Sequence, residues 1–197
     1  MKYPIYIINF FKSFFFDVRF FFTFSLKQRL LASSFEEYST NKIYPQYLKF
    51  GGAVESVRFL ALNYCEGEGV DIGSGIWPLN GARPIENHDT ENAYKINALD
   101  NSLDYVFSSH LLEHLEHHEL AIDEWRRALT PGGILFLYLP HPVCKMWAPQ
   151  VLKEHVWMPD PIYLRNFLPE VGFEILEMSF LPDAMMSYYI VCKKNNA

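Results

Sequence analysis

The chain has 197 residues, of which 50% are hydrophobic, 17% aromatic and 20% charged. This length and composition fit one domain with a sizeable core and exclude disorder of the whole chain. The formal net charge of −6 argues against a nucleic-acid-binding protein that relies on overall basicity. Three widely separated cysteines show neither a disulfide framework nor the spacing of a zinc site, so we expect reduced thiols and a cytoplasmic protein.

The first thirty residues are rich in phenylalanine, with nine of the 17 phenylalanines between Phe10 and Phe24. Charged residues interrupt this run, so it lacks the roughly 18 uncharged residues of a membrane span. Polar residues gather on one narrow side at about 100° per residue, which predicts an amphipathic helix. Residues 1–31 carry five Lys/Arg and one Asp, net +4. The helix therefore either packs on protein, as in a homodimer, or lies peripherally on the anionic inner membrane surface.

The chain divides into residues 1–60, the amphipathic helix and a helical lead-in, and residues 61–197, the main domain. Continuous apolar runs alternate with helical patterns, which predicts an α/β fold with a Rossmann-like, doubly wound and mostly parallel sheet. The last two strands, joined through Pro182-Asp183, predict an antiparallel hairpin at one edge of the sheet. In chain order the expected elements are a helix near 54–63, strands at 69–72, 82–85 and 103–108, a helix at 117–129, a strand at 134–139, a helix at 161–168, and strands at 173–180 and 188–193.

The stretch Val70-Asp71-Ile72-Gly73-Ser74-Gly75 places an acid near the end of an apolar strand, followed by a Gly-x-Gly turn. The two glycines let the backbone bend sharply and approach a ligand beyond the carboxyl end of the strand. Pro78 stands where a dinucleotide fingerprint has its third glycine, which disfavours a nicotinamide-dependent oxidoreductase. Glu86 ends the next apolar run, where a carboxylate can accept both hydroxyls of a ribose. The alternative is a solvated acid in a loop.

Two longer segments follow this turn. DNSLDYVFSSHLLEHL occupies residues 100–115, and EWRRALTPGG with the apolar strand after it begins at residue 124. Together with D-x-G-x-G at 71–75, this order resembles the class I S-adenosylmethionine-dependent methyltransferases, particularly the type 11 methyltransferase domains, over about residues 67–141. GIWPLNGARPIE and LFLYLPHP resemble a compact subgroup associated with bacterial surface-polysaccharide gene clusters.

The resemblance implies S-adenosylmethionine as the cofactor and implies where each part of it binds. Glu86 would hold the ribose hydroxyls and Leu111 would pack near the adenosine. Asn92 stands where the family usually has an aspartate beside the adenine, so a carboxylate is replaced by an amide. The cofactor-binding residues that the resemblance implies are Asp71, Gly73, Ser74, Gly75, Glu86, Asn92, Ala93, Ser109, His110 and Leu111.

The chain between Gly75 and Leu103 is shorter than in most relatives, and Pro78 is expected to truncate the first helix of the fold. This leaves open that one cofactor-covering element is missing and that a partner chain completes the site.

Methyl transfer to an oxygen needs a base near neutrality, and histidine has a suitable pKa. His110 and His141 follow two predicted strands at their carboxyl ends, where the pocket of such a sheet lies. Each is a candidate catalytic base or acceptor contact, with a structural role as the alternative. His114 follows His110 by four residues, a spacing that can hold a metal on a helix. Glu113 and His114 belong to the family pattern without a metal, so we expect no metal site.

Residues 141–160 mix aromatic, basic and proline residues after a strand that borders the pocket. Loops at this place carry acceptor specificity in α/β folds. His141, Lys145, Trp147 and His155 are the candidate substrate-binding residues, and they suit a sugar that carries a phosphate or nucleotide. A proline-rich connector with core tryptophans is an equally good interpretation.

These observations predict a methyltransferase that acts on an oxygen of a sugar, nucleotide sugar or other small hydroxylated acceptor. The alternative from another class is a catalytically silent methyltransferase-like domain that serves as a binding or scaffold subunit. The compressed cofactor region and Asn92 are its support.

Overall fold

The computed structural model describes residues 53–144, 147–183 and 185–196. The Phe-rich segment expected to form an amphipathic helix, and Lys145, lie outside these residues. The elements are α5 (Val54–Ala61), β1 (Gly69–Ile72), β2 (Arg83–Ile85), β3 (Leu103–Ser109), the 3-10 helix η2 (Leu112–His114), α6 (His118–Ala128), β4 (Leu129–Pro140), α7 (Pro161–Glu170), β5 (Phe173–Met178) and β6 (Ser187–Lys194).

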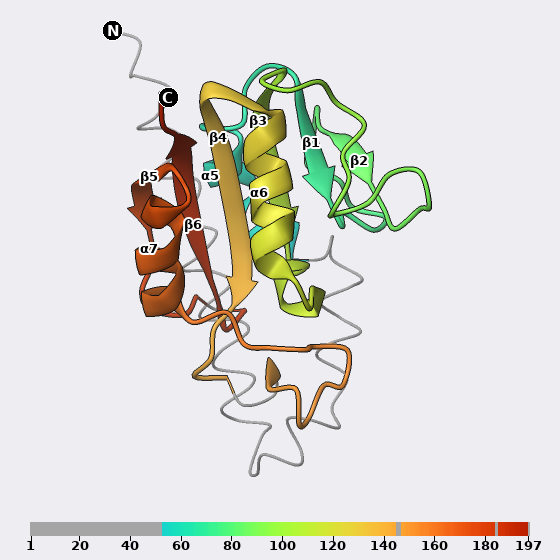
Figure 1. Cartoon of the computed structure of the whole chain (residues 1–197). Helices are drawn as coiled ribbons and strands as arrows, with labels where there is room; N and C mark the ends of the chain where they lie inside the picture. Colours follow the sequence, from blue (N-terminus) through green and yellow to red (C-terminus); the bar gives the residue numbers. More distant parts are fainter. Residues whose placement is uncertain (1–52, 145–146, 184, 197) are drawn as a thin grey trace, which may run out of the picture.

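Six strands form one sheet in the order β2-β1-β3-β4-β6-β5 (Figure 1). The pairs β1–β2, β1–β3 and β3–β4 are parallel. β6 lies antiparallel between β4 and β5, so the hairpin of the last two strands forms one edge of the sheet. The predicted mostly parallel sheet with an antiparallel edge hairpin is confirmed.

Side chains from the central strands pack on both faces of the sheet, which accounts for their continuous apolar sequences. On one face, Ile122 and Trp125 of α6 and Leu164 of α7 pack with Val106 and Leu137. On the other face, α5 packs with aromatic residues of β3 and β4. Figure 1 shows α6 in front of the sheet and α5 behind it. The doubly wound arrangement is confirmed.

Local signals account for the helices. The buried residues of α6 recur at helical spacing, namely Ala121, Ile122, Trp125 and Ala128. α7 begins with Asp160, whose carboxylate accepts hydrogen bonds from the backbone N–H of Ile162 and Tyr163 at 2.8 and 3.0 Å, and Pro161 occupies the first helical position.

β4 begins at Leu129, five residues before the predicted start at Ile134. Leu129 pairs with Leu103 and Ile134 pairs with Tyr105, so residues 130–133 bulge out between the two pairs. Gly132 has φ +80° in this bulge. A glycine-containing turn at this position indicates the end of a strand, and only the pairing with β3 shows that the strand continues.

α5 reaches Ala61, and its Val54, Val57 and Ala61 are buried against the sheet. The division expected after residue 60 therefore falls inside this helix, and the described end of the lead-in shares the core of the main domain.

The three cysteines are buried. Cys65 packs with the α5 face of the sheet, Cys192 packs with the α6 and α7 face, and Cys144 follows β4. They are free thiols, as expected.

Trp125 is fully buried, and its indole N–H donates to the carbonyl of Ala93 at 2.8 Å. We expect Trp125→Ala to lower the free energy of unfolding by about 3–5 kcal/mol, because it removes a large buried side chain and leaves a cavity. Urea unfolding of the full chain measures this change. The control is Leu120→Ala on the same helix, where the side chain is 63% exposed. Equal effects of the two substitutions would contradict the assignment of the buried face of α6.

Candidate functional site

The turn after β1 is built around two glycines with positive φ, Gly73 at +76° and Gly75 at +57°. The backbone N–H of Gly73 donates to the carbonyl of Ile85 at 2.8 Å, which joins the turn to the end of β2. A Cβ at Gly73 would lie 2.9 Å from the side chain of Leu111. Glycine is therefore required here both by the backbone conformation and by the close approach of the segment after β3.

Glu86 holds this turn from the end of β2. Its Oε1 accepts hydrogen bonds from the hydroxyl of Ser74 at 2.8 Å and from the backbone N–H of Gly75 at 2.7 Å. Glu86 is half-buried, so its carboxylate still reaches the cavity beside the turn. Ser74 and Glu86, both predicted from the sequence to bind the cofactor, are brought together.

Asp71 is 1% exposed and faces the interior of the loop that follows β1. Its Oδ2 accepts a hydrogen bond from the backbone N–H of Leu79 at 2.7 Å, whereas Oδ1 has no hydrogen-bond partner among the described residues. Burial raises the pKa of Asp71 to about 7, the bond from Leu79 opposes the rise, and the charge of Glu86 adds to it.

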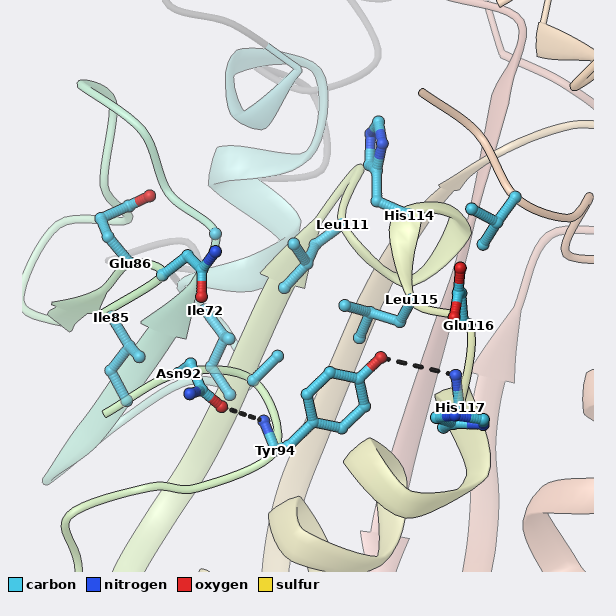
Figure 2. Close-up of a pocket in the computed structure, with 14 residues that line it drawn as sticks. Ile72, Ile85, Glu86, Asn92, Tyr94, Leu111, His114, Leu115, Glu116 and His117 are labelled. Atoms are coloured by element: carbon cyan, nitrogen blue, oxygen red, sulfur yellow. Dashed lines mark hydrogen bonds between the residues drawn. The ribbon is translucent and has the colours of Figure 1, made fainter. Parts of the chain in front are cut away.

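A cavity of about 500 Å³ lies where β1 and β2 end, beside η2 (Figure 2). This volume is in the usual range for a small-molecule site, about 300–1,000 Å³. Fourteen residues line it: Ile72, Gly73, Ile85, Glu86, Asn87, Asn92, Ala93, Tyr94, Leu111, His114, Leu115, Glu116, His117 and Val156.

Five of the ten predicted cofactor-binding residues line this cavity, namely Gly73, Glu86, Asn92, Ala93 and Leu111. The other five, Asp71, Ser74, Gly75, Ser109 and His110, lie outside its lining. Sequence reasoning did not assign Tyr94 or residues 114–117 to the cofactor site, although it considered His114 for other roles. Tyr94 directly follows Asn92-Ala93, and residues 114–117 begin within the segment 100–115, so proximity to these motifs was the available signal.

Asn92 and Tyr94 belong to one tight turn. The side-chain oxygen of Asn92 accepts from the backbone N–H of Tyr94 at 2.9 Å, and its amide donates to the carbonyl of His88 at 3.2 Å. The Tyr94 hydroxyl accepts from the backbone N–H of His117 across the cavity mouth at 3.4 Å (Figure 2). The amide of Asn92 is thus engaged in local structure.

A second group of predicted residues meets beyond the end of β3. His110 has φ +51°, a strained conformation for a residue with a side chain. Its ring lies edge-on to Trp147 at 5.4 Å, and Trp147 stacks on His155 at 5.9 Å. The structure therefore brings together one predicted catalytic residue and two predicted substrate-binding residues.

His110 is held on both sides. Its Nε2 lies 2.9 Å from the hydroxyl of Ser187, which itself donates to the carbonyl of Met185, so His110 is the donor in the first bond. Its Nδ1 lies 3.3 Å from Oε1 of Glu113, a fully buried carboxylate. Burial raises the pKa of Glu113, but the interactions with His110 and His114 outweigh this and hold it below its usual range.

His141 is not part of the cavity lining, but its backbone N–H donates to the carbonyl of Met186, which also accepts from the indole N–H of Trp147. Its Nδ1 accepts from the backbone N–H of Val143 at 3.1 Å, and its Nε2 donates to the carbonyl of Phe180 at 3.0 Å. Both ring nitrogens are engaged with the backbone, so a role of His141 as base stays a prediction that requires one of these bonds to break.

Comparisons with known proteins bear on this arrangement. Residues 51–137 match the family model described as a methyltransferase domain. A search of curated proteins finds no match. Many solved structures share the fold.

An S-adenosylmethionine-dependent methyltransferase from Thermotoga maritima superposes with a TM-score of 0.56 at 14% identity, over 78% of this chain and 95% of that one. One from Archaeoglobus fulgidus gives 0.53 at 18% identity, over 78% and 100%. A chain from the complex of the Haloferax volcanii Trm112 methyltransferase activator with a methyltransferase gives 0.51 at 14% identity, over 72% and 78%.

The fold is that of the S-adenosylmethionine-dependent methyltransferases. The similar solved structures include proteins named as S-adenosylmethionine-dependent methyltransferases, so S-adenosylmethionine is the cofactor to compare with this site. The residues present fit S-adenosylmethionine. The turn after β1 leaves no room for a side chain at Gly73, and Glu86 presents a carboxylate at the cavity beside this turn.

The raised pKa of Asp71 predicts a pH-dependent contribution to stability. The unfolded carboxyl loses its proton near pH 4, whereas the folded one keeps it until about pH 7. Between these values the folded state binds more protons, so the free energy of unfolding falls as pH rises and levels off above pH 7. We expect wild type to lose roughly 2 kcal/mol relative to Asp71→Asn between pH 5 and pH 7.5. Urea unfolding across this range measures the difference.

Asp89→Asn, which removes an exposed carboxylate from the loop after β2, controls for the loss of one negative charge. Parallel stability curves for wild type and Asp71→Asn would contradict the assignment.

Proposed function

We propose that the protein is an S-adenosylmethionine-dependent methyltransferase that methylates an oxygen of a sugar or another small hydroxylated acceptor. The observation that carries this proposal is the cavity beyond β1 and β2, with Gly73, Glu86 and Leu111 on its walls. A match to a methyltransferase domain covers all three of these residues.

Gly73 and the turn around it would hold the methionine part of the cofactor, and Glu86 would hold the ribose. Ala93, whose carbonyl is anchored by Trp125, would lie beside the adenine with Asn92. Ser74 and Gly75 would act through Glu86, which they hydrogen-bond. Asp71 would fix the loop from inside, through its bond to Leu79. Bound S-adenosylmethionine supplies a methyl group that its sulfonium makes electrophilic.

The acceptor would bind near Ser109 and His110, at the end of β3. His110 would contact the hydroxyl, or take its proton once the bond from Nε2 to Ser187 breaks. Its strained backbone supports a functional role, because such conformations concentrate at active sites. Trp147 and His155 stay candidate acceptor contacts, but both rings are buried and stack on each other, so a sugar would reach them only after this loop moves. Lys145 would contact a phosphate, as would Lys153, which is exposed in the same segment. His141 remains a second candidate base or acceptor contact. The resemblance to a polysaccharide-cluster subgroup favours a nucleotide sugar or saccharide as acceptor.

One observation favours the second candidate function, a catalytically silent binding or scaffold subunit. Between β1 and β3 the described chain contains a single three-residue strand and no helix, so the cofactor cavity is walled largely by loops. The chain from the Haloferax volcanii complex comes from an assembly with a methyltransferase activator. We also propose that a partner chain completes the cofactor site of this protein, in which case the chain alone would not bind the cofactor.

Cofactor binding separates these two functions. We expect calorimetric titration of the full chain to show binding of S-adenosylmethionine and S-adenosylhomocysteine but not NAD. Gly73→Arg should weaken this binding at least about 100-fold, because the new side chain enters the space between the turn and Leu111. Gly132→Arg is the matched control: its φ is +80°, close to that of Gly73, and nothing lies within 4 Å of its Cβ position.

Equal affinity of wild type and Gly73→Arg would remove the turn from the cofactor site. Absence of binding by wild type, alone and with membranes or a co-purified partner, would favour the silent subunit.

A peripheral membrane role rests on the amphipathic helix predicted within residues 1–31. Among the described helices, none is long and apolar enough to cross a bilayer. We expect the full chain to sediment with vesicles that contain anionic lipid, to do so less at high salt, and to stay in the supernatant once residues 1–31 are deleted. Vesicles of neutral lipid are the control. A full chain that ignores anionic vesicles would instead favour packing of this segment on protein, as in a homodimer.

A further inference from the structure

Three side chains that commonly bind metals come together beside the cavity. Glu113 and His114 lie in η2, and His155 lies in the segment between β4 and α7. One ligand atom from each lies within 4.8 Å of the others. The sequence shows only the first two as neighbours, and the fold adds the third.

Hydrogen bonds leave the same nitrogen available on both histidine rings. Nδ1 of His114 lies 2.8 Å from the carbonyl oxygen of Glu154, and Nδ1 of His155 lies 2.7 Å from that of Trp147. A carbonyl only accepts, so each Nδ1 carries the proton, and the neutral ring keeps a lone pair on Nε2. Metal-binding histidines almost always donate their other N–H in this way, which fixes the ring and its tautomer.

Glu113 supplies a carboxylate that is fully buried. Neither of its oxygens has a hydrogen-bond partner among the described residues. A buried charge is costly unless it is paired and hydrogen-bonded or coordinates a metal. His110 lies 3.3 Å away on one side, and Nε2 of His155 lies 3.9 Å from Glu113 Oε1. The side toward His114 and His155 therefore presents two imidazole nitrogens to a buried carboxylate that His110 pairs from the other side.

The three ligand atoms lie within 4.8 Å of one another, so they must draw together to coordinate one ion. Zinc binds histidine nitrogen and carboxylate oxygen at about 2.0–2.2 Å, so ligand atoms around a tetrahedral ion lie about 3.4 Å apart. Closing the 3.9 Å separation of His155 and Glu113 to this value requires about half an ångström of side-chain movement. His114 is exposed, whereas the other two are buried, which gives an ion a path from solvent.

From this geometry we propose that Glu113, His114 and His155 bind one divalent transition-metal ion, with Zn²⁺ the best match to two imidazoles and a carboxylate. The ion joins η2 to the segment that contains Trp147 and His155. Two hydrogen bonds already connect these parts, from the backbone N–H of Val156 to Glu113 and from the indole N–H of Trp157 to Leu112. Because His114 also lines the cavity, the metal lies at its rim.

The site is tested on the full chain, stripped with a chelator, dialysed and titrated with Zn²⁺ by calorimetry and with Co²⁺ by visible absorption. We expect one ion per chain and Co²⁺ bands typical of nitrogen and oxygen ligands. His114→Ala and His155→Ala should each weaken binding at least about tenfold. His88→Ala, which removes an exposed histidine outside the cluster, should bind like wild type. Hydrogen exchange in residues 147–156 should slow when the metal is added.

Since His114 is exposed, its loss should not unfold the domain, so this variant keeps the test valid if His155→Ala or Glu113→Gln fails to fold. Absence of a bound ion in wild type would overturn the proposal and assign neutralisation of Glu113 to His110 alone. Unchanged affinity in His114→Ala would overturn it as well, because the ion would then bind elsewhere. The titrations contain no cofactor, so their outcome is independent of the proposed methyltransferase activity.

Discussion

The site depends on the parallel pairing of β3 with β1 on one side and with β4 on the other. Strands that run in the same direction end at the same edge, so the segments that leave them meet there although they are far apart in sequence. The Gly73 turn approaches Leu111 closely enough to exclude a side chain, and His110 donates its backbone N–H to the carbonyl of Tyr138 in β4. The pairing thus sets the positions of the cofactor turn and of His110 with one set of backbone hydrogen bonds.

Two acidic residues give shape to the loop between β1 and β2, which contains no helix in the described chain. Asp71 binds the backbone of Leu79 from inside, and Glu86 binds the backbone of Gly75 from the cavity side. Carboxylates that accept from backbone N–H groups fix a loop whose own sequence, with Trp77-Pro78, does not favour a helix. The loop between β1 and β2 can therefore form a fixed wall of the cavity although it contains no helix.

Most of the sheet could be predicted from the sequence because its central strands are apolar on both faces and bounded by turn residues. The start of β4 could not be predicted, because Gly132 and Gly133 indicate a turn. Only the pairing of Leu129 with Leu103 shows that the strand begins before these glycines. The turn after β1 could be predicted because Gly73 and Gly75 adopt a positive φ, which glycine accommodates best.

The contact of His155 with Glu113 could not be predicted, because it depends on how the segment between β4 and α7 returns to the end of β3. For the same reason, the engagement of both His141 nitrogens by the backbone became visible only in the folded chain.

The buried cysteines have a practical consequence. Burial raises the pKa of Cys192 to about 12 and that of Cys65 further still, so the reactive thiolate is scarce in the folded state. The two residues lie in the cores on opposite faces of the sheet. Their alkylation requires that face to open, so the relative labelling rates of Cys65 and Cys192 report which helical layer detaches more readily from the sheet. The native chain therefore carries one chemical probe for each layer.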